Sequence, residues 1–418
     1  MTAEVAIINP LGIALAADSA VTIQGQGQKV INSNLKLFAL SKTAPVAIML
    51  YGNNNFLNET PWEIIFKLYR RFLKDRTFAT LEEYAEDFLK FLKTRSDVFT
   101  LDKQTQWYKN QLIHFFNLIR NDFIHQTATI PPNEEVRLAI LENHLNVILE
   151  TYQNYPSTLS ETLDFETLNP STDGLVLEVC NTFFSDLPLN VGLINKFIKI
   201  AKLILTNNFI PSLATGIVIA GYGEDEIYPS IVTHEVSGMY SDHLIVKKLD
   251  NKSVINSNDI IVPIAGIIPF AQEDIVMSFI KGIHEKVHEK TYSLIQATLN
   301  QLAFHPSVQV DPNIEIPQLV NSLLTQLNNS INEFTQSEMM DPMINFVRFL
   351  PKDELALMAE TLINITAFKQ KMGSHLETVG GAIDVAIITK GDGLIWVKRK
   401  QYFDPSLNQH FFANYFKG

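Results

Sequence analysis

The chain has 418 residues, enough for two or three domains of about 150 residues each or for one heavily decorated domain. Its residues are 46% apolar and 19% charged, which argues against a disordered chain. The net charge of −12 argues against a nucleic-acid-binding surface, because neutralising phosphates requires clustered Lys and Arg. The single cysteine, Cys180, excludes an intramolecular disulfide and a cysteine-rich metal site.

Neither a secretory signal nor a membrane-spanning segment is expected. No basic stretch precedes an apolar run at the start of the sequence. No apolar run approaches the roughly 18 residues of a spanning helix. We therefore expect a cytoplasmic protein that binds neither membranes nor nucleic acid.

The first 57 residues are predicted to form strands. The apolar runs 4–8 and 13–17 are separated by Asn9-Pro10-Leu11-Gly12, which predicts a hairpin. Further strands are expected at 29–31, 35–40 and 46–51.

Helical patterns replace the strands from about Pro61, where the apolar period changes from two residues towards 3.6. They continue to about Thr206. Strands return at 215–222, 231–236 and 243–248.

The last third of the chain is predicted to hold one long amphipathic helix over 270–301 and a second helix over 353–372. A hairpin over 382–403, with Asp392-Gly393 in its turn, closes the chain. The order strands, helices, strands, helices, strands predicts a mixed α/β (α+β) protein.

Several segments match a known pattern in their order and nearly in their spacing, with an interval from Asp18 to Lys36 that is two residues longer than usual. These are Thr2 at the first strand, GIALAADSAVT from Gly12, LKLFAL from Leu35, VAIMLYG ending at Gly52, TGIVIAGYG from Thr215 and VGGAIDVAIITKGDGLIWV from Val379. Together they resemble the proteasome-type N-terminal-nucleophile (Ntn) hydrolases, the group that holds proteasome β subunits and the bacterial HslV protease. The resemblance covers 2–57, 211–300 and 350–403, and the spacing from Thr2 to Asp18 is the family's own.

The resemblance implies a four-layer αββα sandwich, in which two mainly antiparallel sheets pack face to face between helices. Residues 1–418 would form one domain, with a helical insertion at 75–206 and a smaller insertion at 305–345. It also implies a homo-oligomer, and the two insertions predict a geometry that departs from the family's stacked barrel.

The implied activity is hydrolysis of amide bonds, above all peptide bonds, through an acyl-enzyme on Thr2. A threonine hydroxyl is a weak nucleophile and needs a base. Removal of Met1, which a small second residue favours, would give Thr2 a free α-amine with an unperturbed pKa near 7.7–8.0, able to accept the hydroxyl proton. This chemistry requires no metal or organic cofactor.

The resemblance assigns three further residues to the site. Lys36 would point at Thr2 and lower the pKa of its amine, and Asp18 would hold Lys36 charged and fixed. The N–H of Gly52 would point at the developing oxyanion. Each residue also has an ordinary interpretation: a strand-end aspartate, a lysine on a solvated strand face and a turn glycine.

Parts of the family pattern are missing. The family's serine in a Gly-Ser-Gly-type loop has no counterpart at 263–267. Its second Asp and Ser are also missing, and Leu376 and Val379 stand nearest to their places. The candidates to replace them are Glu377, Thr378 and Asp384. The losses favour an alternative, a decayed scaffold that serves assembly or binding. A small-molecule Ntn amidase is a third hypothesis. The sequence identifies neither the substrate nor an unfoldase partner.

The segment HEKVH, from His284 to His288, fits the H-E-x-x-H pattern in which two His residues bind zinc. No third ligand of the Asp, Glu or His type follows between Lys290 and Phe304. With Val287 expected on a buried stripe, we favour a structural helix over a metal site.

Overall fold

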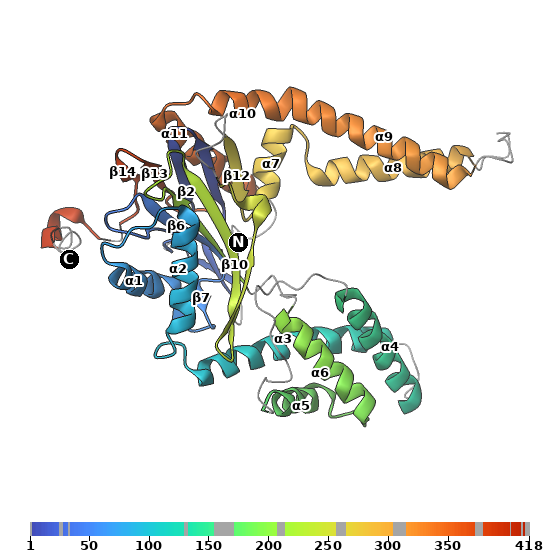
Figure 1. The fold of residues 1–418 in the computed structure, drawn as a ribbon. Coiled ribbons are helices and arrows are strands. Elements are labelled where there is room, and N and C mark those ends of the chain that lie inside the picture. The colour runs from blue at the N-terminus through green and yellow to red at the C-terminus, as the bar shows by residue number, and fades with distance from the viewer. Residues whose placement is uncertain are drawn as a thin grey trace. The chain divides into compact units, whose positions relative to one another are not determined.

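The computed structural model describes residues 2–24, 28–31, 34–128, 133–153, 171–206, 214–255, 265–303, 315–372, 379–401, 403–410 and 413. The chain divides into two compact units (Figure 1). Unit 1 comprises residues 1–49, 220–230 and 255–418, and unit 2 comprises 50–219 and 231–254. The helices and antiparallel strands confirm the mixed α/β class.

The first sheet belongs to unit 1 and has the strand order β12-β1-β2-β13-β14. All of its pairings are antiparallel. The strands are β1 (Glu4–Asn9), β2 (Gly12–Ala17), β12 (Gly266–Phe270), β13 (Asp384–Thr389) and β14 (Gly393–Lys398). Both predicted hairpins, β1–β2 and β13–β14, are confirmed, although β14 ends at Lys398 rather than at 403.

Helices of unit 1 cover one face of this sheet (Figure 1). The covering elements are α7 (Glu273–Lys281), α10 (Asp341–Val347) and α11 (Lys352–Met372). Ala3, Val5 and Ile7 pack into the core that these helices share with the sheet. Because successive strand residues point to opposite faces, Glu4 and Ala6 lie on the other face.

The prediction of one helix over 270–301 is wrong. Phe270 ends β12, α7 ends at Lys281, and α8 (Glu285–Ala303) begins four residues later. Gly282, with φ +71°, ends α7 in the left-handed conformation that glycine adopts without strain. The helix α9 (Ile316–Phe334) packs beside α8 and continues through a π-helical turn, η3 (Thr335–Met340), into α10 (Figure 1).

The second sheet has the order β11-β10-β9-β6-β5. Its strands are β5 (Leu37–Ala39), β6 (Val46–Gly52), β9 (Thr215–Gly221), β10 (Ser230–Tyr240) and β11 (His243–Lys248). Lys36 precedes β5 and does not lie within it, contrary to the strand predicted over 35–40. Two further sheets have two strands each. They pair β3 (Val21–Gln24) with β4 (Gln28–Ile31) and β7 (Asn55–Phe56) with β8 (Thr60–Pro61).

The helices of unit 2 are α1 (Trp62–Leu73), α2 (Leu81–Thr94), α3 (Leu101–Thr127), α4 (Glu134–Gln153), α5 (Ser171–Phe184) and α6 (Val191–Thr206). The indole N–H of Trp62 donates to Thr215 on β9 at 2.9 Å, which fixes the start of α1 to the sheet. The helices α3 to α6 pack against one another, and whether 75–206 is an insertion into one domain stays a prediction. Within the described ranges, every helix is too short or too polar to cross a membrane.

Candidate functional site

The candidate site begins where the β1–β2 ladder extends one residue beyond the strands. The N–H of Asp18 donates to the carbonyl of Ala3 at 3.1 Å, and the N–H of Ala3 donates to Asp18 Oδ1 at 3.1 Å. Ala3 therefore lies opposite Asp18. Thr2, the next residue outward, is buried, with 9% of its surface exposed.

The Asp18 carboxylate accepts four hydrogen bonds. Oδ1 accepts from Ala3 N–H and from Lys36 Nζ at 2.5 Å. Oδ2 accepts from Ala20 N–H at 3.2 Å and from Gly380 N–H at 3.0 Å. Asp18 thus joins the start of the chain to the loop before β13, which is 362 residues away in sequence.

Lys36 and Asp18 form an ion pair closed to solvent, with side-chain exposures of 1% and 0%. Burying a charge is costly unless a close partner compensates for its lost hydration, as Asp18 does here. Since one oxygen of Asp18 binds both Lys36 Nζ and Ala3 N–H, the ammonium lies beside the backbone of the residue that follows Thr2. The predicted pairing of Asp18 with Lys36 is therefore present.

Glu4 is a member of this cluster that the sequence analysis missed. The residue is 1% exposed, and neither carboxylate oxygen has a hydrogen-bond partner among the described residues. Burial raises the pKa of Glu4 well above its usual range, while the charge of Lys36 lowers it and that of Asp18 raises it. The available signal was a carboxylate two residues from Thr2 at the head of an apolar strand.

Residues just before β13 also bind Ser19, the residue that follows Asp18. The N–H of Ser19 donates to Gly380 O at 3.2 Å, and its hydroxyl donates to Ala382 O. Asp384, a candidate replacement for the family's second aspartate, accepts the backbone N–H of Lys400 at 2.6 Å. Burial raises the pKa of Asp384, and that bond lowers it.

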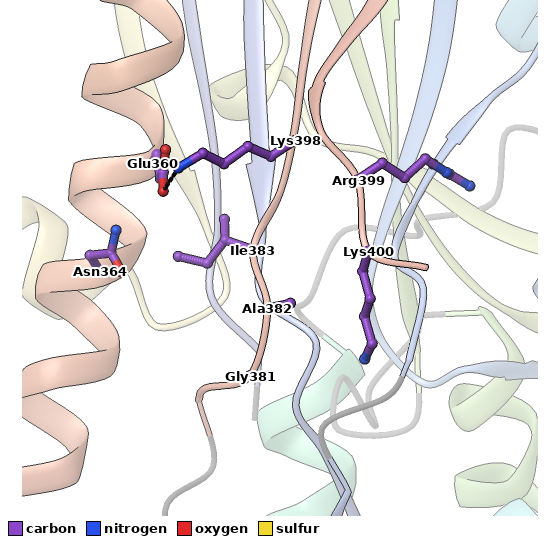
Figure 2. A pocket seen from close by; sticks show the side chains of 8 residues that line it. All are labelled: Glu360, Asn364, Gly381, Ala382, Ile383, Lys398, Arg399 and Lys400. Carbon is purple, nitrogen blue, oxygen red and sulfur yellow. Dashed lines mark hydrogen bonds and ion pairs between the residues drawn. The ribbon is translucent and has the colours of Figure 1, made fainter. Parts of the chain in front are cut away.

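A surface pocket of about 360 Å³ opens next to this loop, between α11 and the β13–β14 strands (Figure 2). Lys398 reaches across it to Glu360 at 2.6 Å, as Figure 2 shows. Burial lowers the pKa of Lys400, the charge of Asp384 raises it, and the charge of Lys36 lowers it. The pocket is lined by Glu360, Asn364, Gly381, Ala382, Ile383, Lys398, Arg399 and Lys400.

Gly52 belongs to unit 2. Its φ is +85°, and a Cβ would lie 2.5 Å from the carbonyl oxygen of Ala214, so the backbone requires glycine here. Its role as an oxyanion donor stays a prediction. Residues 376–378 and 263–264, part of the segments compared with the family's missing residues, lie outside the described ranges.

The HEKVH segment begins the helix α8. His284 Nδ1 accepts the N–H of Lys286 at 3.2 Å, and its carbonyl accepts the N–H of His288 at 3.1 Å, so His284 caps α8. The expectation that Val287 is buried is wrong, since it is 55% exposed on α8. No group of three or more His, Cys, Asp or Glu side chains suited to a metal occurs in the described part of the chain.

A scan against protein-family models and a search of curated proteins each give no match. The geometry around Asp18 and Lys36 is therefore the basis on which a function can be proposed.

Proposed function

We propose that this protein is a threonine-type hydrolase that cleaves amide bonds, chiefly peptide bonds, through an acyl-enzyme on Thr2. The observation that carries the proposal is the shared oxygen of Asp18, which binds Lys36 Nζ and Ala3 N–H together. This arrangement supports a fixed, buried cation beside the first residue of the chain that remains after Met1 is removed. The four-layer sandwich is the corresponding proposal for the fold.

The proposed reaction starts with attack of Thr2 Oγ on the carbonyl carbon of the substrate. The α-amine of Thr2 takes the hydroxyl proton, and the carbonyl electron pair moves to oxygen. As the C–N bond breaks, the proton passes to the leaving nitrogen, and water later hydrolyses the ester. Lys36 stabilises the alkoxide and disfavours a charged amine, and Asp18 holds Lys36 in place. The oxyanion role of Gly52 rests on the resemblance alone.

A decayed scaffold is the second candidate, and one observation favours it. Asp384 accepts the backbone N–H of Lys400, and among the described residues no hydrogen bond joins it to Thr2. A scaffold would retain the Asp18–Lys36 pair as a structural link and show no reactivity at Thr2.

Labelling by a threonine-reactive electrophile distinguishes the two candidates. Intact mass should first show that Met1 is absent. A peptidyl β-lactone should then acylate the parent protein once, with the adduct mapped to Thr2. Thr2→Ala should give no adduct. Lys36→Met should label at least about 100-fold more slowly, because it removes the charge that stabilises the attacking alkoxide. Each 1.4 kcal/mol of lost transition-state stabilisation slows the reaction about tenfold.

Lys398→Met is the matched control, because Lys398 forms an exposed ion pair with Glu360 and should label at the parent's rate. Lys36→Arg should rescue poorly, since the planar guanidinium cannot occupy the position of the ammonium. Full retention of Met1, or a parent protein that never labels, would overturn the proposal in favour of the scaffold.

A further inference from the structure

Glu4 and Thr2 lie on the same face at the start of the chain. Ala3, Val5 and Ile7 point into the helix-covered core of unit 1. Alternation along the strand then turns Thr2 and Glu4 to the opposite face. A carboxyl group is thus placed two residues after the proposed nucleophile, on its side of the sheet.

Among the residues that the structure describes, none donates a hydrogen bond to the Glu4 carboxyl. Its cross-strand neighbours in register are Ala17 on β2 and Phe270 on β12, which offer no polar side chain. The Lys36 ammonium donates to Asp18, so these two charges already balance each other. A buried polar group without a partner is rare and destabilising, and in native proteins it points to a missing partner.

Removal of Met1 creates a new polar group at this place. The α-ammonium of Thr2 would lie beside Ala3 N–H and Lys36 Nζ, two donors that already share Asp18 Oδ1. Two cations would then face one carboxylate in a site closed to solvent. Glu4 supplies the second carboxylate, which restores the balance of charge.

We propose that Glu4 is the proton partner of the Thr2 α-amino group, so that in the mature chain the carboxyl and the amine share one proton. The inference rests on the proposed removal of Met1. The proton moves from the amine nitrogen to a Glu4 oxygen, and no other bond changes. With the proton on Glu4, the amine is neutral and has its lone pair free for the hydroxyl proton of Thr2. Glu4 is therefore a positioning residue that acts through Thr2.

The proposal predicts how stability depends on pH in two forms of the protein. With Met1 retained, folded Glu4 keeps a proton that the unfolded chain releases above about pH 4.5, so stability falls as pH rises. In the mature form, the Glu4 carboxyl and the Thr2 amine together hold one proton in the folded state. In the unfolded chain the same two groups also hold one proton, on the ammonium, up to about pH 7.5. The contribution of Glu4 and the amine to stability should then be flat between about pH 5 and 7.5, and groups elsewhere, such as His234, contribute equally to both forms.

Glu4→Gln should change these slopes differently in the two forms. With Met1 retained, it removes the titrating carboxyl and makes the contribution of this site to stability flat. In the mature form, it leaves the amine alone beside Lys36, where the folded state loses the amine proton before the unfolded state does. Stability of the mature variant should therefore rise with pH between about pH 6 and 8. Asp18, Lys36, Lys400 and Asp384, the other charged groups around the site, are the same in all forms.

The experiment compares melting temperature against pH in four proteins. Parent and Glu4→Gln are each prepared with Met1 held under an uncleaved N-terminal tag, and from a fusion cleaved directly before Thr2. Between about pH 5 and 6, Glu4→Gln should raise the slope of the tagged form by roughly 3–5 °C per pH unit and leave the slope of the mature form unchanged. Between about pH 6 and 7.5, the slope of the mature variant should exceed that of the mature parent by the same amount. Asp384→Asn, a buried carboxylate with its own backbone donor, is the control and should shift both forms alike.

The inference is wrong if Glu4→Gln alters the pH slope equally in the tagged and mature forms between about pH 5 and 6, which is the result expected when Glu4 and the amine titrate independently. The β-lactone rate of the mature protein separates this failure from failure of the proposed function. At low pH, the rate at which the parent is labelled should depend on two coupled ionisations, those of Glu4 and the amine. The labelling rate of Glu4→Gln should depend on one. A parent that labels with the variant's profile sinks the inference alone. A parent that never labels but shows the expected slopes sinks the hydrolase alone.

Discussion

Replacing Lys36 by methionine tests how strongly the Asp18–Lys36 pair stabilises unit 1. Methionine keeps an unbranched chain but removes the charge, so the Asp18 carboxylate loses its cation at a place closed to solvent. Breaking a buried ion pair by removing one partner costs about 3–5 kcal/mol. Asp18 keeps three backbone donors, from Ala3, Ala20 and Gly380, so we expect the lower end, about 3 kcal/mol.

The expected loss is large enough to measure by thermal unfolding. At 2–4 °C per kcal/mol for a unit of 150–250 residues, Lys36→Met should lower Tm by roughly 6–12 °C. Asp18→Asn should cost at least as much, because it leaves the Lys36 ammonium buried without its carboxylate. Labelling assays on either variant must therefore run well below the lowered Tm, so that lost reactivity is not mistaken for unfolding.

A double-mutant cycle isolates the interaction between the two charges. The variant carrying both Lys36→Met and Asp18→Asn buries no net charge, so its cost should be about 2–3 kcal/mol smaller than the two single costs added together. Lys398→Met, which breaks an exposed pair with Glu360, should cost less than about 1 kcal/mol. Single costs that add to the double cost within about 0.5 kcal/mol would refute the ion pair and the electrostatic role derived from it.

Two further predictions concern polar groups away from the site. Asn9→Ala should lower the free energy of unfolding in urea by about 2–4 kcal/mol, because the Asn9 amide donates to Val347 O and Leu350 O and accepts from Leu11 N–H and Gly12 N–H; a change below 0.5 kcal/mol, the size expected of a surface residue, would contradict this role. Burial lowers the pKa of His234 to about 4, so the unfolded chain binds a proton that the folded chain refuses between about pH 6.5 and 4; acidification should cost about 3 kcal/mol, and His234→Gln should flatten that part of the urea-midpoint profile.

The elements around the site follow from local signals. Two apolar runs on either side of Asn9-Pro10-Leu11-Gly12 predicted the β1–β2 hairpin, whose register runs from Glu4 opposite Ala17 to Asn9 opposite Gly12. The spacing of Asp18 and Lys36 suggested their pairing only through a family resemblance. Nothing local specifies that pairing, because it depends on how the segment before β5 returns to the end of β2.

Errors arose where a glycine or a distant contact overrides the local pattern. The apolar period over 270–301 continues across Gly282, although its left-handed backbone ends α7. The sequence predicts Lys36 on a strand, where alternation with Leu37 decides its exposure. The structure places Lys36 before β5, buried and paired with Asp18. A periodicity argument cannot supply a contact between residues that lie in different elements.

Glu4 shows why the charges of this site could not be read along the chain. A glutamate at the head of an apolar strand is ordinarily exposed, and its burial here depends on β12, paired with it from more than 260 positions away, where Phe270 lies opposite. Within the described part of the chain, the carboxyl has no hydrogen-bond donor. Removal of Met1 would create a free amine at Thr2, which by strand alternation would lie on the same side of the sheet as that carboxyl. On this argument, the charges of the site suit the mature N-terminus and disfavour the unprocessed one, which ties the stability of unit 1 to the same cut that would make Thr2 a nucleophile.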